Sequence, residues 1–138
     1  MAQVSQTQLG AAQTNKYLPL LENKSVGLVV NQTAKIGDIH LVDLLITNGI
    51  NVRTVFAPEH GFRGDKGAGE TIENGLDPST KLPIISLYGK QKKPTQAMLA
   101  DIDILVFDIQ DVGVRFYTYI STMHYVMEAA AELGIPVI

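Results

Sequence analysis

The chain has 138 residues, enough for one domain. Its composition of 46% hydrophobic and 18% charged residues excludes a disordered chain. With 14 acidic and 11 basic residues the net charge is −3, which excludes the strongly basic footprint of a nucleic-acid binder. The sequence has no cysteine, so disulfides and a cysteine nucleophile are excluded, and no apolar run approaches the roughly 20 residues of a membrane-spanning helix.

Apolar runs alternate with helical patterns along the chain. Residues 1–24 are expected to form a polar N-terminal arm and a short helix that ends at Leu21. Strands are expected at residues 25–31, 51–57, 82–87 and 103–109, and a fifth begins at residue 135. Helices are expected at residues 39–48, at 94–101 with Pro94 in the first turn, and at 117–133, where Gly134 ends the helix.

Strands that are apolar along their whole length are typical of a parallel sheet buried on both faces. With right-handed crossovers, the sequence therefore predicts an α/β fold of three layers over residues 25–138, with a doubly wound, mostly parallel, Rossmann-like sheet. One face of the last helix is expected in the core through Met123, Val126, Met127 and Ala130.

Two features do not fit a complete, free-standing domain. The chain ends inside the fifth apolar run, which predicts a sheet truncated in its fifth strand and a longer parent protein. The connection over residues 58–81 is far longer than the usual 2–6 or so residues between a strand and a helix, which predicts a functional loop.

Polar residues follow the ends of the expected strands. In open α/β sheets, ligands bind beyond the carboxyl ends of the strands, so these residues are the candidates for a site. They are Asn31, Glu59, His60, Arg63, Tyr88, Asp108, Gln110, Asp111, Arg115 and Tyr117.

Glu59 and Asp108 are expected at the rim of one crevice. Glycoside hydrolysis typically needs one carboxylic acid to protonate the leaving oxygen and a second group to stabilise or attack the anomeric carbon. Phe56, Pro58 and Phe62 surround Glu59 in sequence, and apolar neighbours favour the protonated form of an acid. The alternative is structural: Glu59 caps a helix or pairs with an arginine, and Asp108 caps a turn.

His60 is a candidate metal ligand, proton shuttle or substrate donor. A metal site needs three or more converging ligands, and His40 and His124 lie in expected helices, away from the rim. Glu59 and Asp108 do not complete a recognised ligand spacing, so no metal is expected.

The loop after residue 60 is rich in glycine. It matches neither the GxGxxG pattern nor the P-loop, so no nucleotide cofactor is expected. It is expected either to serve only as a turn or to act as a lid in which Arg63 and Glu70 offer hydrogen bonds to a sugar or a carboxylate.

Residues 111–119 join the fourth expected strand to the last helix. Arg115 has the geometry to bind a carboxylate with two hydrogen bonds, and Tyr117 has a ring that can stack on a sugar. The alternatives are an ion pair between Arg115 and Asp111, and tyrosines at 117 and 119 that pack on the sheet.

Taken together, the strand ends resemble the exo-β-N-acetylmuramidase family, the NamZ/YbbC-like proteins. The resemblance runs from about residue 26 to the last residue. The motifs that carry it are NQT at 31–33, FAPEHGFRGD at 56–65, GAGE at 67–70, SLYGK at 86–90, KPT at 93–95 and LVFDIQDVGVRFYTYI at 105–120.

The resemblance implies an exported enzyme of the periplasm or cell envelope that acts in cell-wall recycling. Its substrate is a small muramyl saccharide, and it removes terminal N-acetylmuramic acid from the non-reducing end of peptidoglycan fragments without a cofactor. Its site lies between the Rossmann-like domain and a smaller C-terminal domain that this chain lacks. Glu59 is the expected catalytic acid, with His60 and Asp108 as further catalytic residues.

Two points stay open from the sequence. The nucleophile is either a protein group or the substrate's own N-acetyl group, in which case Asp108 or Asp111 orients the amide. A non-catalytic muramyl-sugar-binding module and a metal-dependent hydrolase that uses Glu59, His60 and Asp108 are the competing functions.

Overall fold

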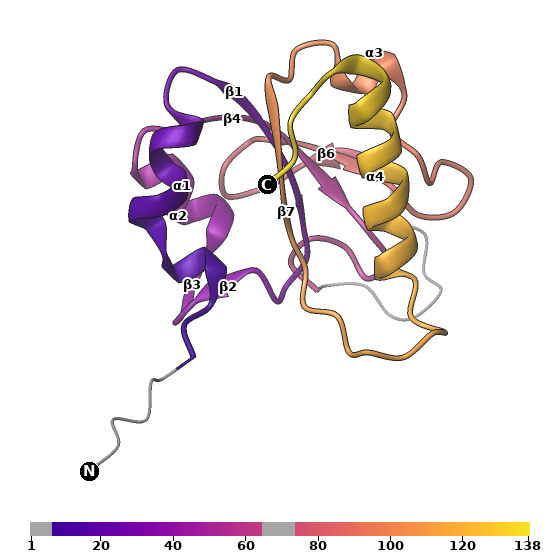
Figure 1. The fold of residues 1–138 in the computed structure, drawn as a ribbon, viewed down its shortest axis with the longest axis horizontal. Helices are drawn as coiled ribbons and strands as arrows, with labels where there is room; N and C mark the ends of the chain where they lie inside the picture. Colours follow the sequence, from indigo (N-terminus) through magenta and orange to yellow (C-terminus); the bar gives the residue numbers. More distant parts are fainter. Residues whose placement is uncertain (1–6, 65–73) are drawn as a thin grey trace.

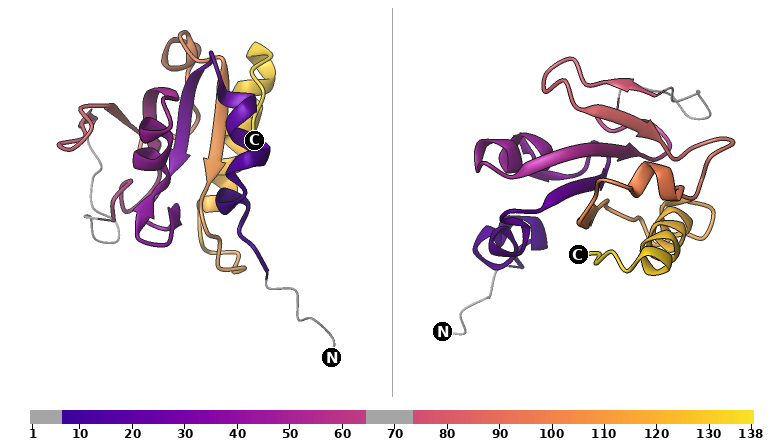
Figure 2. Two further views of the ribbon diagram at one scale, coloured as in Figure 1. Left: turned by 90° about the vertical axis from the view of Figure 1, so that its left-hand side faces the viewer. Right: turned by 90° about the horizontal axis from the view of Figure 1, so that it is seen from above.

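A computed structural model gives the fold of the chain and describes residues 7–64 and 74–138. A five-stranded sheet of order β5-β6-β4-β1-β7 lies between two layers of helices (Figures 1 and 2). The parallel strands are β1 (Ser25–Val30), β4 (Asn51–Ala57), β6 (Pro83–Ser86) and β7 (Ile104–Asp108), and β5 (Gly75–Leu76) pairs antiparallel with β6. This confirms the predicted α/β, doubly wound sheet.

The helices divide between the two faces of the sheet. One face carries η1 (Gly10–Ala12), α1 (Thr14–Leu21) and α2 (Leu41–Thr47), and the other carries α3 (Gln96–Leu99) and α4 (Tyr119–Leu133) (Figure 2). Val137 forms one parallel bridge with Leu105, so the last residues run beside β7 as the expected fifth strand would. β4 and β6 follow one another on one side of β1, and β7 lies on its other side. The switch point of the sheet is therefore between β1 and β7.

Three helix boundaries differ from the prediction. Residues 39–40 belong to β3 (Ile39–His40), which forms a small hairpin with β2 (Lys35–Ile36), so α2 begins only at Leu41. Pro94 lies outside α3 because Thr95 is the N-cap, whose hydroxyl accepts the Met98 N–H at 3.3 Å. The last helix begins at Tyr119 rather than at 117.

The strands contribute to two separate apolar cores. Leu28, Val30 and Val106 pack with α1 and α2, whereas Val29 and Phe56 pack with α3 and α4. Successive side chains on a strand point to opposite faces, so each of the four parallel strands contributes to both cores. The same alternation decides on which face of the sheet the side chains at the strand ends lie.

The core face of α4 is narrower than predicted. Its buried residues are Tyr119, Thr122, Val126, Ala129 and Ala130. Met123 and Met127 are 37% and 51% exposed, which corrects their assignment to the core. Each follows a buried residue by one position and is therefore turned about 100° around the helix from it.

Gly27 in β1 leaves no room for a side chain. A Cβ atom there would lie 2.7 Å from Leu105 Cδ2 and 3.2 Å from Phe56 Cε2, both inside the core. We expect Gly27→Ala to lower the free energy of unfolding by about 1–3 kcal/mol, because the core must shift to admit the methyl group. Urea denaturation measures this, with Gly10→Ala as control, since nothing lies within 4 Å of a Cβ at that position. Equal stability of the two variants would contradict the close packing around β1.

Candidate functional site

The carboxyl ends of the four parallel strands lie at one edge of the sheet. Asn31 directly follows β1, Glu59 comes two residues after β4, Tyr88 comes two residues after β6, and Asp108 ends β7. The predicted candidates from distant parts of the sequence are thus brought to the same edge.

Glu59 lies at the tip of a tight turn. The Gly61 N–H donates to the Pro58 carbonyl at 3.1 Å, so Glu59 and His60 occupy the two central positions. His60 has φ = 73°, a left-handed conformation that usually belongs to glycine at this position of a turn. Strained backbone of this kind is concentrated at functional sites, and here it holds Glu59 beyond the end of β4.

Two hydroxyl groups from other loops bind the carboxylate of Glu59. Tyr88 Oη donates to Oε1 at 3.0 Å, and Thr118 Oγ1 donates to Oε2 at 3.4 Å. Thr118 is the N-cap of α4 but makes no capping bond with its side chain, because its hydroxyl is directed to Glu59 instead. The hydrogen bond to Glu59 also raises the pKa of the Tyr88 phenol. The loops after β6 and β7 therefore fix the orientation of this carboxylate.

A pocket of about 170 Å³ opens beside this carboxylate and is called the Glu59 pocket below. Hydroxyl groups and one lysine surround the acid, and Leu87 supplies an apolar side. The lining residues are Glu59, Leu87, Tyr88, Lys92, Thr118, Ser121, Thr122 and Tyr125. Such a mixture of hydroxyl groups, an aromatic ring and one acid suits a sugar, which has hydroxyls to bind and apolar C–H faces to cover.

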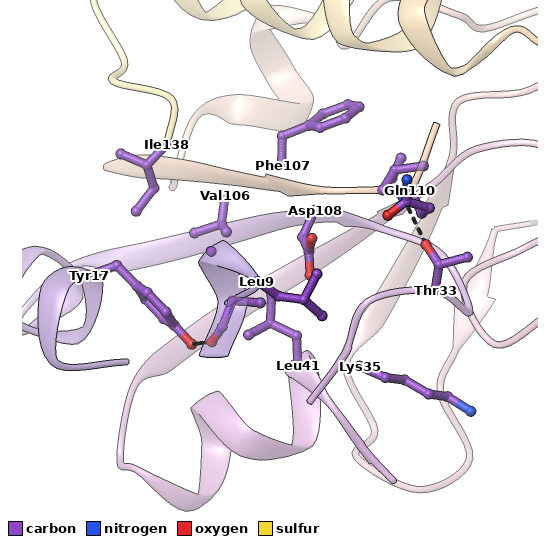
Figure 3. Close-up of a pocket in the computed structure, with 13 residues that line it drawn as sticks. Leu9, Tyr17, Thr33, Lys35, Leu41, Val106, Phe107, Asp108, Gln110 and Ile138 are labelled. Atoms are coloured by element: carbon purple, nitrogen blue, oxygen red, sulfur yellow. Dashed lines mark hydrogen bonds between the residues drawn. The ribbon is translucent and has the colours of Figure 1, made fainter. Parts of the chain in front are cut away.

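Asp108 lies at the same edge but on the other face of the sheet. It is two residues from Val106, so its side chain points toward the α1 and α2 layer, away from Phe107 (Figure 3). There it lines a second pocket of about 440 Å³. Burial raises the pKa of the Asp108 carboxyl. Among the described residues, Glu59 and Asp108 thus line two different pockets.

The second pocket is larger and mainly apolar. Its walls come from η1 and α1, from the start of α2, from the end of β7, and from the last residue of the chain. The lining residues are Leu9, Gly10, Ala11, Tyr17, Thr33, Lys35, Leu41, Val106, Phe107, Asp108, Ile109, Gln110 and Ile138 (Figure 3).

A hydrogen-bond network joins the loops that follow β1 and β7. Asn31 is fully buried, and its Oδ1 accepts from the Thr33 N–H at 2.9 Å and hydroxyl at 2.6 Å. The Thr33 hydroxyl accepts in turn from the Gln110 N–H at 2.9 Å (Figure 3). Within the described residues Asn31 Nδ2 has no partner, although it is buried. These contacts fix the switch point of the sheet rather than the Glu59 pocket.

His40 is part of the same edge, which corrects its expected place away from the rim. It is buried, its Nδ1 accepts the Val42 N–H at 3.2 Å, and its Nε2 donates to the Asn31 carbonyl at 2.9 Å. Burial lowers the pKa of His40. Because Nδ1 accepts the Val42 N–H, the ring carries its proton on Nε2. His40 therefore caps α2 and supports Asn31.

Arg63 is held by two carboxylates instead of pointing into a pocket. Its Nε and Nη2 donate to Asp77 at 3.0 and 2.9 Å, and Nη1 and Nη2 donate to Asp43 at 3.2 Å each. The guanidinium also covers the Phe62 ring at 4.5 Å, and this ring meets the edge of His40 at 5.2 Å. Phe62 thus packs away from Glu59, and Arg63 joins the end of the Glu59 turn to Asp43 and Asp77.

The exposed loop before α4 contains four of the other candidates. Asp111 Oδ2 accepts the Gly113 N–H at 2.9 Å, and the Gln110 side chain donates to the Asp111 carbonyl at 2.9 Å. Arg115 and Tyr117 are exposed and line none of the described pockets. The pairing of Arg115 with Asp111 is not observed among the described residues.

The remaining expectations concern one tyrosine, a loop residue and a metal. Tyr119 is buried at the start of α4, as the packing alternative predicts. Glu70 lies outside the described residues. Over residues 7–64 and 74–138 there is no cluster of three side chains suited to a metal, and no helix is long and apolar enough to cross a membrane.

Comparison with known proteins gives one family and three relatives. The family described as "Exo-beta-N-acetylmuramidase NamZ, N-terminal" matches residues 26–138. The chain is 51% identical over 122 residues to the peptidoglycan beta-N-acetylmuramidase NamZ of Bacillus subtilis (strain 168), a match that covers 87% of this chain and 30% of that protein.

Two crystal structures of DUF1343-family proteins from Bacteroides fragilis have the same fold. One superposes with a TM-score of 0.79 at 43% identity over 93% of this chain and 32% of its own. The other also has a TM-score of 0.79, at 46% identity over 90% of this chain and 31% of its own. The chain therefore spans about a third of the length of these relatives.

Proposed function

From the premise that the chain belongs to the family of NamZ exo-β-N-acetylmuramidases, whose N-terminal region it matches, we propose that its protein is a glycosidase. It removes terminal N-acetylmuramic acid from the non-reducing end of peptidoglycan fragments. The relative from Bacillus subtilis is named for the hydrolysis of peptidoglycan at this sugar. The observation that carries the proposal is the carboxylate of Glu59, held by Tyr88 and Thr118 in a pocket lined by several hydroxyl groups.

Glu59 is the general acid in this proposal. A sugar bound in the Glu59 pocket places its glycosidic oxygen near the carboxyl group, which gives its proton to that oxygen as the bond to the anomeric carbon breaks. Tyr88 and Thr118 each bind one carboxylate oxygen, which leaves the group a single orientation. His60 completes the turn that presents Glu59.

The second group of the reaction comes from the substrate. Glu59 is the only acid among the residues that line its pocket in the described part of the chain, and Asp108 lies in the second pocket. This favours the acetamido oxygen of N-acetylmuramic acid, which is close to its own anomeric carbon, as the internal nucleophile. Asp108 then supports the switch point of the sheet and does not attack the sugar.

The rest of the parent protein completes the cleft in this proposal. The relatives are about three times as long as this chain. A smaller C-terminal domain closes over the pocket and covers the sugar. The substrate also places the protein in the cell envelope, so we propose that it is exported to the periplasm or the cell surface.

Release of N-acetylmuramic acid tests the function. We expect the protein at its native length to liberate this sugar from a disaccharide that has N-acetylmuramic acid at its non-reducing end. The disaccharide with the two sugars exchanged should stay intact, since its terminal sugar lacks the lactyl ether. Saturable binding of the muramyl disaccharide without any release would instead favour a sugar-binding module.

Metal removal should leave the activity unchanged. The reaction as proposed uses a protein carboxyl group and a group of the substrate, and the described residues hold no cluster suited to a metal. We expect the same rate of sugar release after dialysis against EDTA, measured with and without added Mg²⁺ or Zn²⁺. A rate that falls with EDTA and returns with one metal would favour the metal-dependent hydrolase.

A further inference from the structure

Lys92 is the only cationic residue that lines the Glu59 pocket within the described residues. It follows β6 and the Tyr88 loop and is exposed. In the ranges 7–64 and 74–138 it makes no ion pair with a carboxylate. Its ammonium group is therefore available to a ligand in the pocket.

The neighbouring lysine is used in a different way. Lys93 Nζ contacts Glu132 at 2.7 Å and Glu128 at 3.2 Å, both on α4. These two ion pairs direct the Lys93 side chain to the helix whose first turns form one wall of the Glu59 pocket. The charge of Lys93 is therefore committed to α4, unlike that of Lys92.

The other cations near this edge do not compete for a ligand in the pocket. Arg63 is occupied by Asp43 and Asp77. Arg115 is exposed on the loop before α4 and does not line the Glu59 pocket. Among the residues that the structure describes, the positive charge available in the Glu59 pocket is that of Lys92.

We propose that Lys92 binds the carboxylate of the lactyl ether of N-acetylmuramic acid and so selects this sugar over N-acetylglucosamine. This inference rests on the proposed function and names a specificity residue for it. The two sugars differ at one position, where the muramic acid carries an ether with one negative charge. A lysine is a point charge on a flexible chain, so it can follow a carboxylate that rotates about the ether.

The hydroxyl groups in the pocket strengthen this assignment. Ser121 and Tyr125 line the pocket on α4, together with Lys92. They can donate hydrogen bonds to the second carboxylate oxygen while the ammonium group binds the first. Charge-assisted hydrogen bonds of this kind are stronger than neutral ones, and a sugar without the carboxylate forms none of them.

The test compares two substrates in the protein at its native length. For Lys92→Gln we expect kcat/KM to fall about 10-fold or more on a terminal N-acetylmuramyl glycoside, mainly through a higher KM. On the matching N-acetylglucosaminyl glycoside any residual rate should stay within about twofold of the wild type, so the ratio between the two substrates falls about 10-fold or more. Lys92→Arg keeps the charge and should restore most of the selectivity.

Lys90→Gln is the matched control. It removes one positive charge from an exposed lysine of the same loop that does not line the pocket, and it should leave both substrates unaffected. If Lys92→Gln behaves like Lys90→Gln while the wild type still releases N-acetylmuramic acid, the inference is wrong and the proposed function stands. Loss of selectivity in Arg115→Gln but not in Lys92→Gln would also overturn it.

Direct binding separates the inference from the proposed function. If the wild type releases no N-acetylmuramic acid, the function fails, and titration with free N-acetylmuramic acid and free N-acetylglucosamine still tests the role of Lys92. Weaker binding of the acid alone in Lys92→Gln supports the inference. Equal binding of the acid by the wild type and this variant, or no binding by either, overturns it.

Discussion

Replacing Glu59 with glutamine is expected to lower kcat for the release of N-acetylmuramic acid by about 10²–10⁴-fold, the usual contribution of a general acid. The amide keeps the shape of the side chain, and its oxygen can still accept a hydrogen bond from Tyr88, which lies 3.0 Å from Oε1. Only the transferable proton is lost, so KM should change little. Steady-state rates on a muramyl disaccharide measure both values in the protein at its native length.

The leaving group provides a sharper form of this test. A nitrophenolate leaves without help from an acid, whereas a sugar alkoxide needs a proton. The loss of rate in Glu59→Gln should therefore be much smaller on a nitrophenyl N-acetylmuraminide than on the disaccharide. Equal losses on the two substrates would show that Glu59 does not act as the acid, and undiminished activity on both would remove it from catalysis.

Tyr88→Phe is the matched control for the orientation of Glu59. It removes the hydrogen bond to Oε1 but leaves the acid in place, so its effect should be well below that of Glu59→Gln. Thr118 still binds Oε2 in this variant, at 3.4 Å. If Tyr88→Phe lost as much activity as Glu59→Gln, we would conclude that the tyrosine and not Glu59 donates the proton.

The sequence predicted the edge at which the candidates meet but not the face on which each one lies. Parallel strands have their carboxyl ends at one edge, so the position of Glu59 and Asp108 there follows from the order of strands and helices. The strand that ends in Asp108 is apolar on both faces, so its pattern contains no alternation that assigns a side chain to one face. The separation of Glu59 and Asp108 onto two faces of the sheet therefore could not be predicted from the sequence.

The hydrogen-bond partners of Arg63 also could not be predicted from the sequence. Asp77 is 14 residues away and Asp43 is 20, and neither distance matches a helix or strand spacing. Lys92 and Thr118 were overlooked because a lone lysine and a lone threonine in loops carry no pattern. His40 was placed in a helix because the two-residue strands of its hairpin are too short for a periodic signal.

A buried carboxylate holds Arg63, which lies four residues after Glu59. The Asp77 side chain is only 1% exposed and accepts hydrogen bonds from the Thr80 hydroxyl at 2.6 Å and N–H at 2.9 Å, in addition to those from Arg63. The hydrogen bonds from Arg63 hold the pKa of the Asp77 carboxyl far below its usual 3.8. The carboxylate is therefore charged in the folded state at every pH at which the protein is handled.

Asp77→Asn is expected to lower the free energy of unfolding by about 2–4 kcal/mol at pH 7 and to flatten its dependence on acid. The variant leaves the Arg63 charge beside a neutral amide, and breaking one side of a buried pair is costly. In the wild type the unfolded chain takes up a proton near pH 3.8 while the folded chain does not. The stabilisation from Asp77 is thus complete above about pH 5 and is lost as the pH falls below this range.

Urea denaturation between pH 7 and pH 3 measures both effects in the wild type, Asp77→Asn and Asp43→Asn. Asp43 pairs with the same guanidinium, but its side chain is 41% exposed, so water screens the pair and the control should lose less than about 1 kcal/mol. Because Asp77 holds Arg63 at the end of the Glu59 turn, Asp77→Asn should also reduce kcat more than Asp43→Asn does. Identical stability and identical acid dependence in the two variants would contradict the prediction. They would show that the buried Asp77 stabilises the fold no more than the exposed Asp43 does.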